Sequence, residues 1–191
     1  MARDLGTQAG EVHRAAEILH FWLEEIPPEK RFVHDPAIDE TCRGRFGALR
    51  DAVFAGAAAG WRGTPEHLLA AIILLDQFSR NLFRDDARSF DADPLSRSLT
   101  REALAREWDR GLDAPSRQFL YMPLMHSERM ADQICSLRLY ADLGQAESLA
   151  FARKHAAQIA RFGRFPQRNE VLGRQSSAAE TEFLSRPGAR F

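Results

Sequence analysis

Residues 64–81 read TPEHLLAAIILLDQFSRN and predict a buried helix that begins at Pro65 and runs to about Asn81. Threonine is a common N-cap and proline is favoured at the first helical position, so Thr64 and Pro65 mark the start. The apolar run at 68–75 covers about two turns, far short of the roughly 20 residues that cross a bilayer. A helix this apolar needs other helices packed around it.

The sequence on both sides of this stretch predicts those helices. Apolar residues recur every three or four positions, and prolines and glycines interrupt the pattern at short intervals. The chain has 29 alanines but only 16 valines, isoleucines and threonines, a composition that favours helix over sheet. We expect further helices at about residues 8–25, 36–60, 94–109, from 115 to an interruption near Pro123, 127–143, 145–162 and 177–184, the last opened by a capping box.

These elements indicate a single all-α domain over residues 1–191, built from antiparallel helix pairs in a bundle or a short superhelix. The net charge is −1, so we expect neither nucleic acid nor a membrane as a partner. We find no secretory segment and therefore expect a cytoplasmic protein. Arginine supplies 24 of the 26 basic residues, which draws attention to the arginines that helix and turn patterns do not explain.

Polar residues interrupt the helix predicted at 65–81. Asp76 extends its apolar stripe, so the carboxylate should be partly buried, and a buried charge needs a partner. Arg80 lies four residues on, on the same face, and Gln77 and Asn81 form a second pair with this spacing. These residues indicate either a structural ion pair or one wall of a polar pocket.

The segment YMPLMHSE at 121–128 delivers polar residues to the start of a helix. His126 and Glu128 are candidates for a general acid and base there. The alternative is that Ser127 or Glu128 satisfies the free backbone amides of the first helical turn, and that His126 is only a hydrogen-bonding residue.

The segment RFGRFPQRN at 161–169 combines glycine and proline with three arginines. Glycine and proline predict a rigid turn, and guanidinium groups in fixed positions bind carboxylate or phosphate through two hydrogen bonds. The alternative is that these arginines neutralise Asp76, Glu128 and their neighbours. The candidates here are Arg161, Arg164, Arg168 and Asn169.

The sequence shows no recognisable metal or cofactor motif. Glu17 and His20 form a single Glu-x-x-His pair, whereas a helical di-iron site needs two such pairs and two further glutamates. No His-Glu-x-x-His, Walker or dinucleotide-binding pattern is present. We therefore expect no metal and no cofactor.

Three segments together resemble a widespread bacterial family catalogued as a domain of unknown function. They are LLDQFSRN at 74–81, YMPLMHSE at 121–128 and RFGRFPQRN at 161–169, and LHFW at 19–22 is also similar. The resemblance covers nearly the whole chain, with Ser79 in place of an expected proline. It implies a tetratricopeptide-like all-helical fold and brings no activity, substrate or cofactor.

Three functions fit these residues. The leading hypothesis is a binding protein whose groove, lined by arginine, aspartate, histidine and glutamate, receives an anionic small molecule or an acidic peptide end. The second is an enzyme of hydrolase or lyase type that uses His126, Glu128 and Asp76. The third is a buried ion-pair network with a structural role only.

Overall fold

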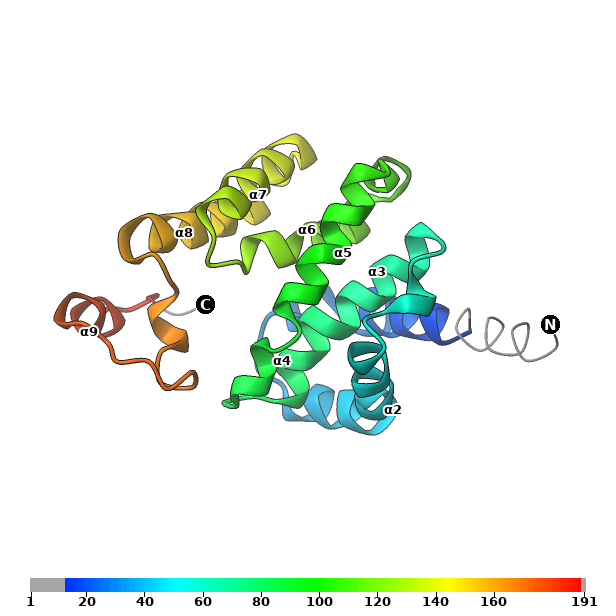
Figure 1. Cartoon of the computed structure of the whole chain (residues 1–191), viewed down its shortest axis with the longest axis horizontal. Coiled ribbons are helices and arrows are strands. Elements are labelled where there is room, and N and C mark those ends of the chain that lie inside the picture. The colour runs from blue at the N-terminus through cyan, green and yellow to red at the C-terminus, as the bar shows by residue number, and fades with distance from the viewer. Residues whose placement is uncertain (1–12, 190–191) are drawn as a thin grey trace. The chain divides into compact units, whose positions relative to one another are not determined.

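A computed structural model describes residues 13–189. Over this range the chain forms helices and no β-strand, which confirms the all-α prediction (Figure 1). The tetratricopeptide-like packing stays a prediction. The α-helices from residue 36 onward are α2 (Pro36–Ala55), α3 (Pro65–Ile73), α4 (Ser79–Leu82), α5 (Asp93–Ala105), α6 (Ala114–Met125), α7 (Met130–Leu143), α8 (Ala146–Phe162) and α9 (Ala178–Leu184).

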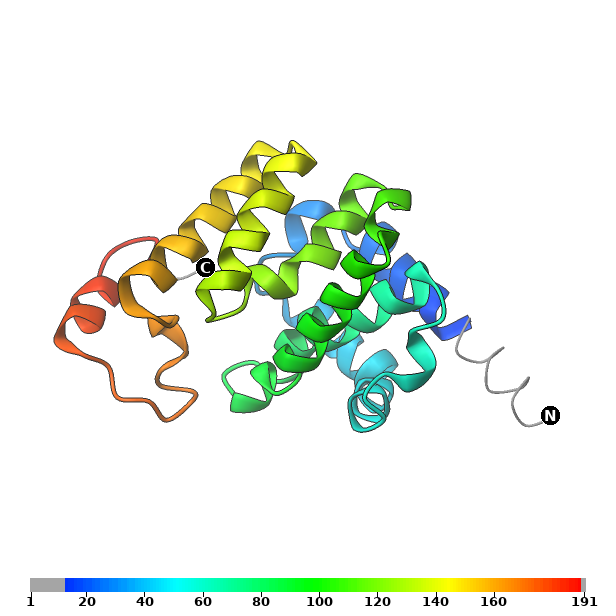
Figure 2. The same cartoon turned by 45° about the horizontal axis from the view of Figure 1, so that its top comes forward.

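The described chain divides into two compact units. The first comprises residues 13–84 and 88–123, and the second comprises residues 85–87 and 124–189. Helices α2 to α5 and most of α6 belong to the first unit, and α7 to α9 belong to the second (Figures 1 and 2). The single domain over residues 1–191 stays a prediction.

The first unit begins with a helix whose last turn is widened. Residues 13–20 are α-helical, and Phe21–Glu25 form a π turn, in which hydrogen bonds join residues five apart. Ile26 ends this helix directly before the two prolines that predict its end. The predicted part at 8–12 lies outside the described residues.

The helix predicted at 65–81 is present and consists of three parts. Thr64 caps α3, since its hydroxyl oxygen accepts a hydrogen bond from the His67 amide at 3.2 Å. Leu74–Phe78 then form a second π turn, and α4 completes the helix. Every side chain from 68 to 79 is buried, so this helix is the core of the first unit.

Phe78 joins the two π turns. Its ring lies 5.8 Å from the Phe21 ring and 5.4 Å from the Trp22 ring, both edge to face. It also lies 5.0 Å from the Phe46 ring of α2. Aromatic pairs of this kind contribute about 0.5–1.5 kcal/mol each beyond the area they bury. The cluster therefore fixes the π turn that carries Asp76.

Helix α2 ends earlier than predicted. Asp35 caps its start, and its last residue is Ala55 rather than a residue near Gly60. The cause is the backbone of Ala57 and Ala58, whose φ angles of 50° and 55° are left-handed. A right-handed helix cannot continue through such residues.

Helices α5 and α6 also differ from the prediction. Helix α5 stops at Ala105 rather than near 109, because Glu107 has a φ of 55° and Trp108–Gly111 form a 3-10 turn. Helix α6 continues through Pro123, where the sequence predicts an interruption. Proline lacks a backbone N–H, so Pro123 cannot donate to the Phe119 carbonyl four residues earlier. Because α6 ends two residues after Pro123, the helix loses only this one hydrogen bond.

In the second unit α7 and α8 are antiparallel and pack side by side (Figures 1 and 2). Gly144 ends α7 and Gly163 ends α8, with φ angles of 74° and 70° that glycine adopts without a Cβ clash. Helix α7 begins at Met130, three residues after Ser127, where the sequence predicts its start. The Ser127 hydroxyl donates to the Asp132 carboxylate at 2.7 Å instead of capping the first turn.

Residues 163–176 form a loop between α8 and α9. It contains one 3-10 turn, Pro166–Arg168. The predicted capping box follows, because Ser177 accepts the Glu180 amide and the Glu180 carboxylate accepts the Ser177 amide. This box holds Glu180 beside the loop.

Candidate functional site

Asp76 and Arg80 form an ion pair inside the first unit. The Asp76 side chain is 1% exposed, and its Oδ1 lies 3.3 Å from a terminal guanidinium nitrogen of Arg80. Arg80 also donates to the Asp76 carbonyl and to both carboxylate oxygens of Asp93, at 3.1 and 3.3 Å. Burial alone would lower the pKa of Arg80, but the two carboxylates hold that pKa above its ordinary value.

Gln77 and Asn81 do not form the pair that their spacing predicts. The Gln77 amide donates to Asp76 Oδ2 at 2.6 Å and contacts Met122 Sδ at 3.1 Å. The Asn81 amide donates to the Asp39 carboxylate at 2.8 Å. Each of the two amides is therefore held by an aspartate and not by the other amide.

The partners Asp39 and Asp93 were missed in the sequence. Asp39 accepts two hydrogen bonds from Arg84, at 2.9 and 2.8 Å, besides the one from Asn81. Burial would raise the pKa of Asp39, but Arg84 and Asn81 hold that pKa below its ordinary value. Both aspartates lie in the first turn of a helix, where acidic residues are common because they favour the helix dipole. Because acidic residues are so common at helix starts, the sequence gives no sign that these two aspartates pair with arginines.

In the second unit Glu128 holds the loop at 163–176. Its carboxylate accepts hydrogen bonds from the Phe165 amide at 2.9 Å and from two nitrogens of Arg174 at 2.7 and 2.9 Å. Burial alone would raise the pKa of Glu128, but Arg174 and the Phe165 amide hold that pKa below its ordinary value. Glu128 therefore stays ionised near neutral pH, which suits an ion pair better than a general acid.

Arg168 and His126 meet in the same unit. The buried Arg168 donates to the His126 carbonyl at 3.0 Å, and its guanidinium carbon lies 4.6 Å from the centre of the Phe165 ring. The His126 ring lies 5.9 Å from the His155 ring. His155 Nδ1 in turn lies 2.9 Å from the Phe151 carbonyl oxygen.

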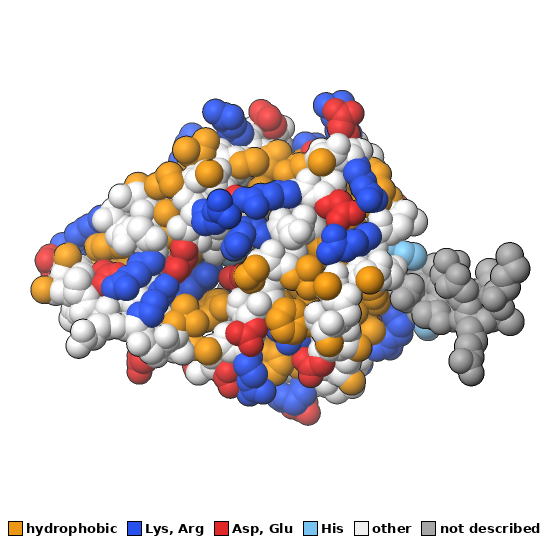
Figure 3. Space-filling model, in the orientation of Figure 1, with side chains coloured by type: hydrophobic (Ala, Val, Ile, Leu, Met, Phe, Trp, Pro, Cys, Tyr) orange, Lys and Arg blue, Asp and Glu red, His pale blue; other side chains and the backbone are white. Residues whose placement is uncertain are grey.

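Arg164 is bound by Glu180 through two hydrogen bonds, at 2.7 and 2.8 Å. Arg164 also donates to the Gln175 carbonyl at 2.8 Å, and the buried Asn169 donates to Ser176 Oγ at 3.1 Å. The hydrogen bonds from Arg164 hold the pKa of Glu180 well below its usual range, although burial opposes this shift. Basic and acidic side chains accordingly lie side by side over α9 and the preceding loop (Figure 3).

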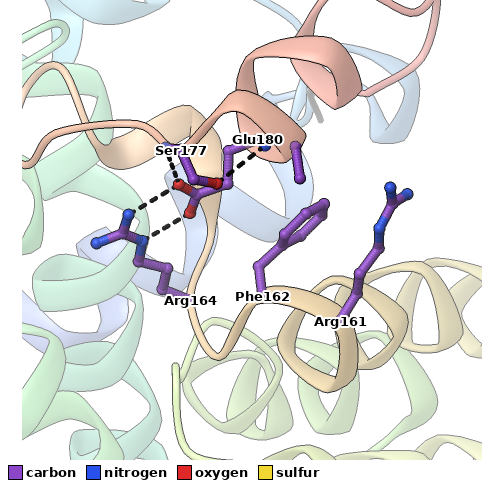
Figure 4. Close-up of a pocket in the computed structure, with 6 residues that line it drawn as sticks. Arg161, Phe162, Arg164, Ser177 and Glu180 are labelled. Carbon is purple, nitrogen blue, oxygen red and sulfur yellow. Dashed lines mark hydrogen bonds and ion pairs between the residues drawn. The ribbon is translucent and has the colours of Figure 1, made fainter.

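An open pocket of about 430 Å³ lies between the end of α8 and the start of α9 (Figure 4). Figure 4 shows Arg161 apart from the Arg164–Glu180 pair, on the other side of Phe162. The Arg161 guanidinium lies 4.7 Å from the Phe162 ring and 5.7 Å from the Phe183 ring. Within residues 13–189 it pairs with no carboxylate. The pocket is lined by Arg161, Phe162, Arg164, Ser177, Ala179 and Glu180.

The candidate residues fall into two sets. One set, in the first unit, comprises Asp76, Gln77, Arg80 and Asn81. The other, in the second unit, comprises His126, Glu128, Arg161, Arg164, Arg168 and Asn169. A single groove lined by both sets stays a prediction. Sequence reasoning missed four pocket residues, Phe162, Ser177, Ala179 and Glu180. The capping box of Ser177 and Glu180 is a signal that marks the last three of them.

The described residues offer neither a metal site nor a membrane span. No group of three or more His, Cys, Asp or Glu among them could hold a metal ion. Glu17 instead bonds Arg14 at 2.6 Å, and His20 bonds Glu24 at 2.9 Å. Across residues 13–189, every helix is too short or too polar to cross a membrane.

Comparison with known proteins identifies the family. The model of the family described as "Bacterial protein of unknown function (DUF924)" matches residues 18–188. The structure of a protein of unknown function from Agrobacterium tumefaciens, ATU0120, is similar, with 36% sequence identity and a TM-score of 0.87. The match covers 91% of this chain and 98% of that one. No curated protein matches. The chain therefore belongs to the DUF924 family of bacterial proteins of unknown function.

Proposed function

We propose that this protein binds an anionic ligand, a small carboxylate or the acidic end of a peptide, in the pocket between α8 and α9. One observation carries the proposal: Arg161 lines the pocket, and no carboxylate of the described residues neutralises it. The nearby Arg164 and Arg174 are instead bound to Glu180 and Glu128. An unpaired guanidinium in a pocket favours an anion from outside the protein.

Aromatic rings position Arg161 without neutralising its charge. The rings of Phe162 and Phe183 lie 5.1 Å apart, and the guanidinium rests against both. A cation over an aromatic face gains about 0.5–1 kcal/mol at an exposed site. Arg161 is therefore partly ordered before a ligand arrives, which lowers the entropy lost on binding.

The other pocket residues favour a carboxylate that carries an apolar group. Ser177 is occupied by Glu180, because its hydroxyl oxygen accepts a hydrogen bond from the Glu180 amide at 3.2 Å and its side chain also hydrogen-bonds the Glu180 carboxylate. Phe162 offers an apolar surface, and the Arg164–Glu180 pair adds no net charge.

Titration with N-acetyl-phenylalanine tests the proposal. Isothermal titration calorimetry should show saturable binding to the intact protein, and N-acetyl-phenylalanine amide, which lacks the carboxylate, should bind much more weakly. Arg161→Ala should weaken binding about 10- to 100-fold, because a hydrogen bond to a charged group contributes about 1.5–3 kcal/mol. Arg138→Ala is the matched control, since Arg138 is an exposed arginine of α7 that does not line the pocket. Absence of binding, or equal binding by Arg161→Ala, would refute the proposal.

A further inference from the structure

The exposed face of α8 carries positive charge up to the pocket. Positions 150, 154, 157 and 161 follow the spacing of one helix face, and 153 and 160 flank them. All six side chains are exposed. They are Ala150, Arg153, Lys154, Ala157, Ala160 and Arg161.

The three cations of this face are not neutralised. Within the described part of the chain, Arg153, Lys154 and Arg161 pair with no carboxylate. The Lys154 ammonium lies 5.1 Å from the centre of the Phe151 ring, a contact that leaves its charge unchanged. Arg164, just beyond α8, is by contrast bound by a glutamate. This face of α8 therefore keeps its positive charge, whereas the positive charge of Arg164 in the adjoining loop is neutralised.

We infer that this face and the pocket together bind the carboxyl end of an acidic peptide. The terminal carboxylate meets Arg161, and an acidic side chain three residues earlier meets Lys154. The two cations are seven residues apart, about 10.5 Å along the helix axis, and three residues of extended peptide span about 10 Å. The inference rests on the proposed function, because it uses the same pocket.

The rest of the face sets the length and the class of the partner. The side chains of Ala157 and Ala160, between the cations, are short, so an extended peptide can lie close to the helix there. Glu147 is exposed and lies seven residues before Lys154, on the same side of α8. Its charge repels an acidic chain that runs further. This arrangement favours a short acidic peptide over nucleic acid, whose phosphates continue past the last cation.

Two acetylated tetrapeptides with free carboxylates test the inference, Asp-Ser-Ser-Phe and Asn-Ser-Ser-Phe. Calorimetry at low salt should show the intact protein binding the Asp peptide about threefold to fivefold more tightly, the size expected for an exposed ion pair. Lys154→Gln should abolish this preference and leave the affinity for the Asn peptide unchanged. Ala157→Glu should weaken the Asp peptide most, by repulsion. Arg138→Gln, on α7, should change nothing.

The outcomes separate the inference from the proposed function. If Lys154→Gln keeps the preference, or the intact protein shows none, the inference is wrong while binding that depends on Arg161 still supports the pocket. If Arg161→Ala binds both peptides as tightly as the intact protein, or if neither peptide binds, both ideas are wrong. Displacement of the Asp peptide by a thymidine oligonucleotide of equal charge would refute the choice of a peptide.

Discussion

Replacing Arg174 with alanine should lower the free energy of unfolding by about 2–3 kcal/mol. Arg174 makes two hydrogen bonds to the Glu128 carboxylate and a third to the Phe165 carbonyl at 3.2 Å. The side chains of Arg174 and Glu128 are 24% and 27% exposed. The pair therefore lies between exposed ion pairs, which contribute about 0–1 kcal/mol, and buried ones, whose disruption costs about 3–5 kcal/mol.

The same change should alter how stability depends on pH. Arg174 keeps the pKa of Glu128 low in the folded state, so the pair stabilises the protein above the ordinary glutamate pKa of 4.5. This contribution is lost as the pH falls below that value. In Arg174→Ala, burial still raises the pKa of Glu128, and only the Phe165 amide and the charge of Arg168 oppose it. The stability difference between the two proteins should therefore be larger at pH 7 than at about pH 4.

Urea unfolding followed by circular dichroism at both pH values measures these differences. For a protein of this size the loss corresponds to a fall in Tm of about 5–10 °C. Glu128→Gln and the double variant complete a cycle, and the coupling between the two side chains should exceed about 1 kcal/mol. A loss below about 0.5 kcal/mol, additive effects, or equal losses at both pH values would refute the reasoning.

Four further predictions concern other residues. Asp76→Ala should cost about 3–5 kcal/mol in urea unfolding, because Arg80 loses a buried partner, and a loss below about 1 kcal/mol would contradict the ion pair. Gly163→Ala should lower the free energy of unfolding by about 1 kcal/mol, since the φ of 70° disfavours a Cβ, and an unchanged Tm would argue against this. Cys42 should resist a thiol reagent at pH 8 in the native protein, because burial raises its pKa to about 12, and labelling as fast as in urea would show otherwise. Stability should fall as the pH drops below about 4.5, because Glu180 has a lowered pKa only when folded, and Glu180→Gln should flatten this fall in thermal melts.

The helices could be predicted because their ends carry residues with one dominant role. The Thr64 cap, the capping box of Ser177, and Gly144 and Gly163 after α7 and α8 all lie where the sequence predicts them. The ends predicted too late are those of α2 and α5. There a left-handed backbone falls on alanine or glutamate, which prefer a right-handed helix, so the sequence carries no signal.

The candidate site could be predicted as a set of segments but not as a set of partners. The sequence singled out Arg164 and Glu128, yet the first is bound by Glu180 and the second by Arg174. Partners depend on which loops and helices meet, and residues 16 and 46 positions apart leave no periodic pattern. The sequence names Arg161 as a candidate alongside Arg164 and Arg168, and only the structure distinguishes it from them, because it lies in a pocket without an acidic partner among the described residues.

The π turn at Leu74–Phe78 sets the direction of the polar residues that follow it. Such a turn holds one residue more than a turn of α-helix, yet it rotates the chain about as far. If the same residues formed regular α-helix, everything after them would be rotated by about 100°. Asn81 would then point away from Asp39, and Arg80 away from Asp93. Deleting one residue between 74 and 78 would instead restore a regular turn and leave these directions nearly unchanged. The segment should therefore tolerate the loss of one residue better than a change that straightens the turn at full length.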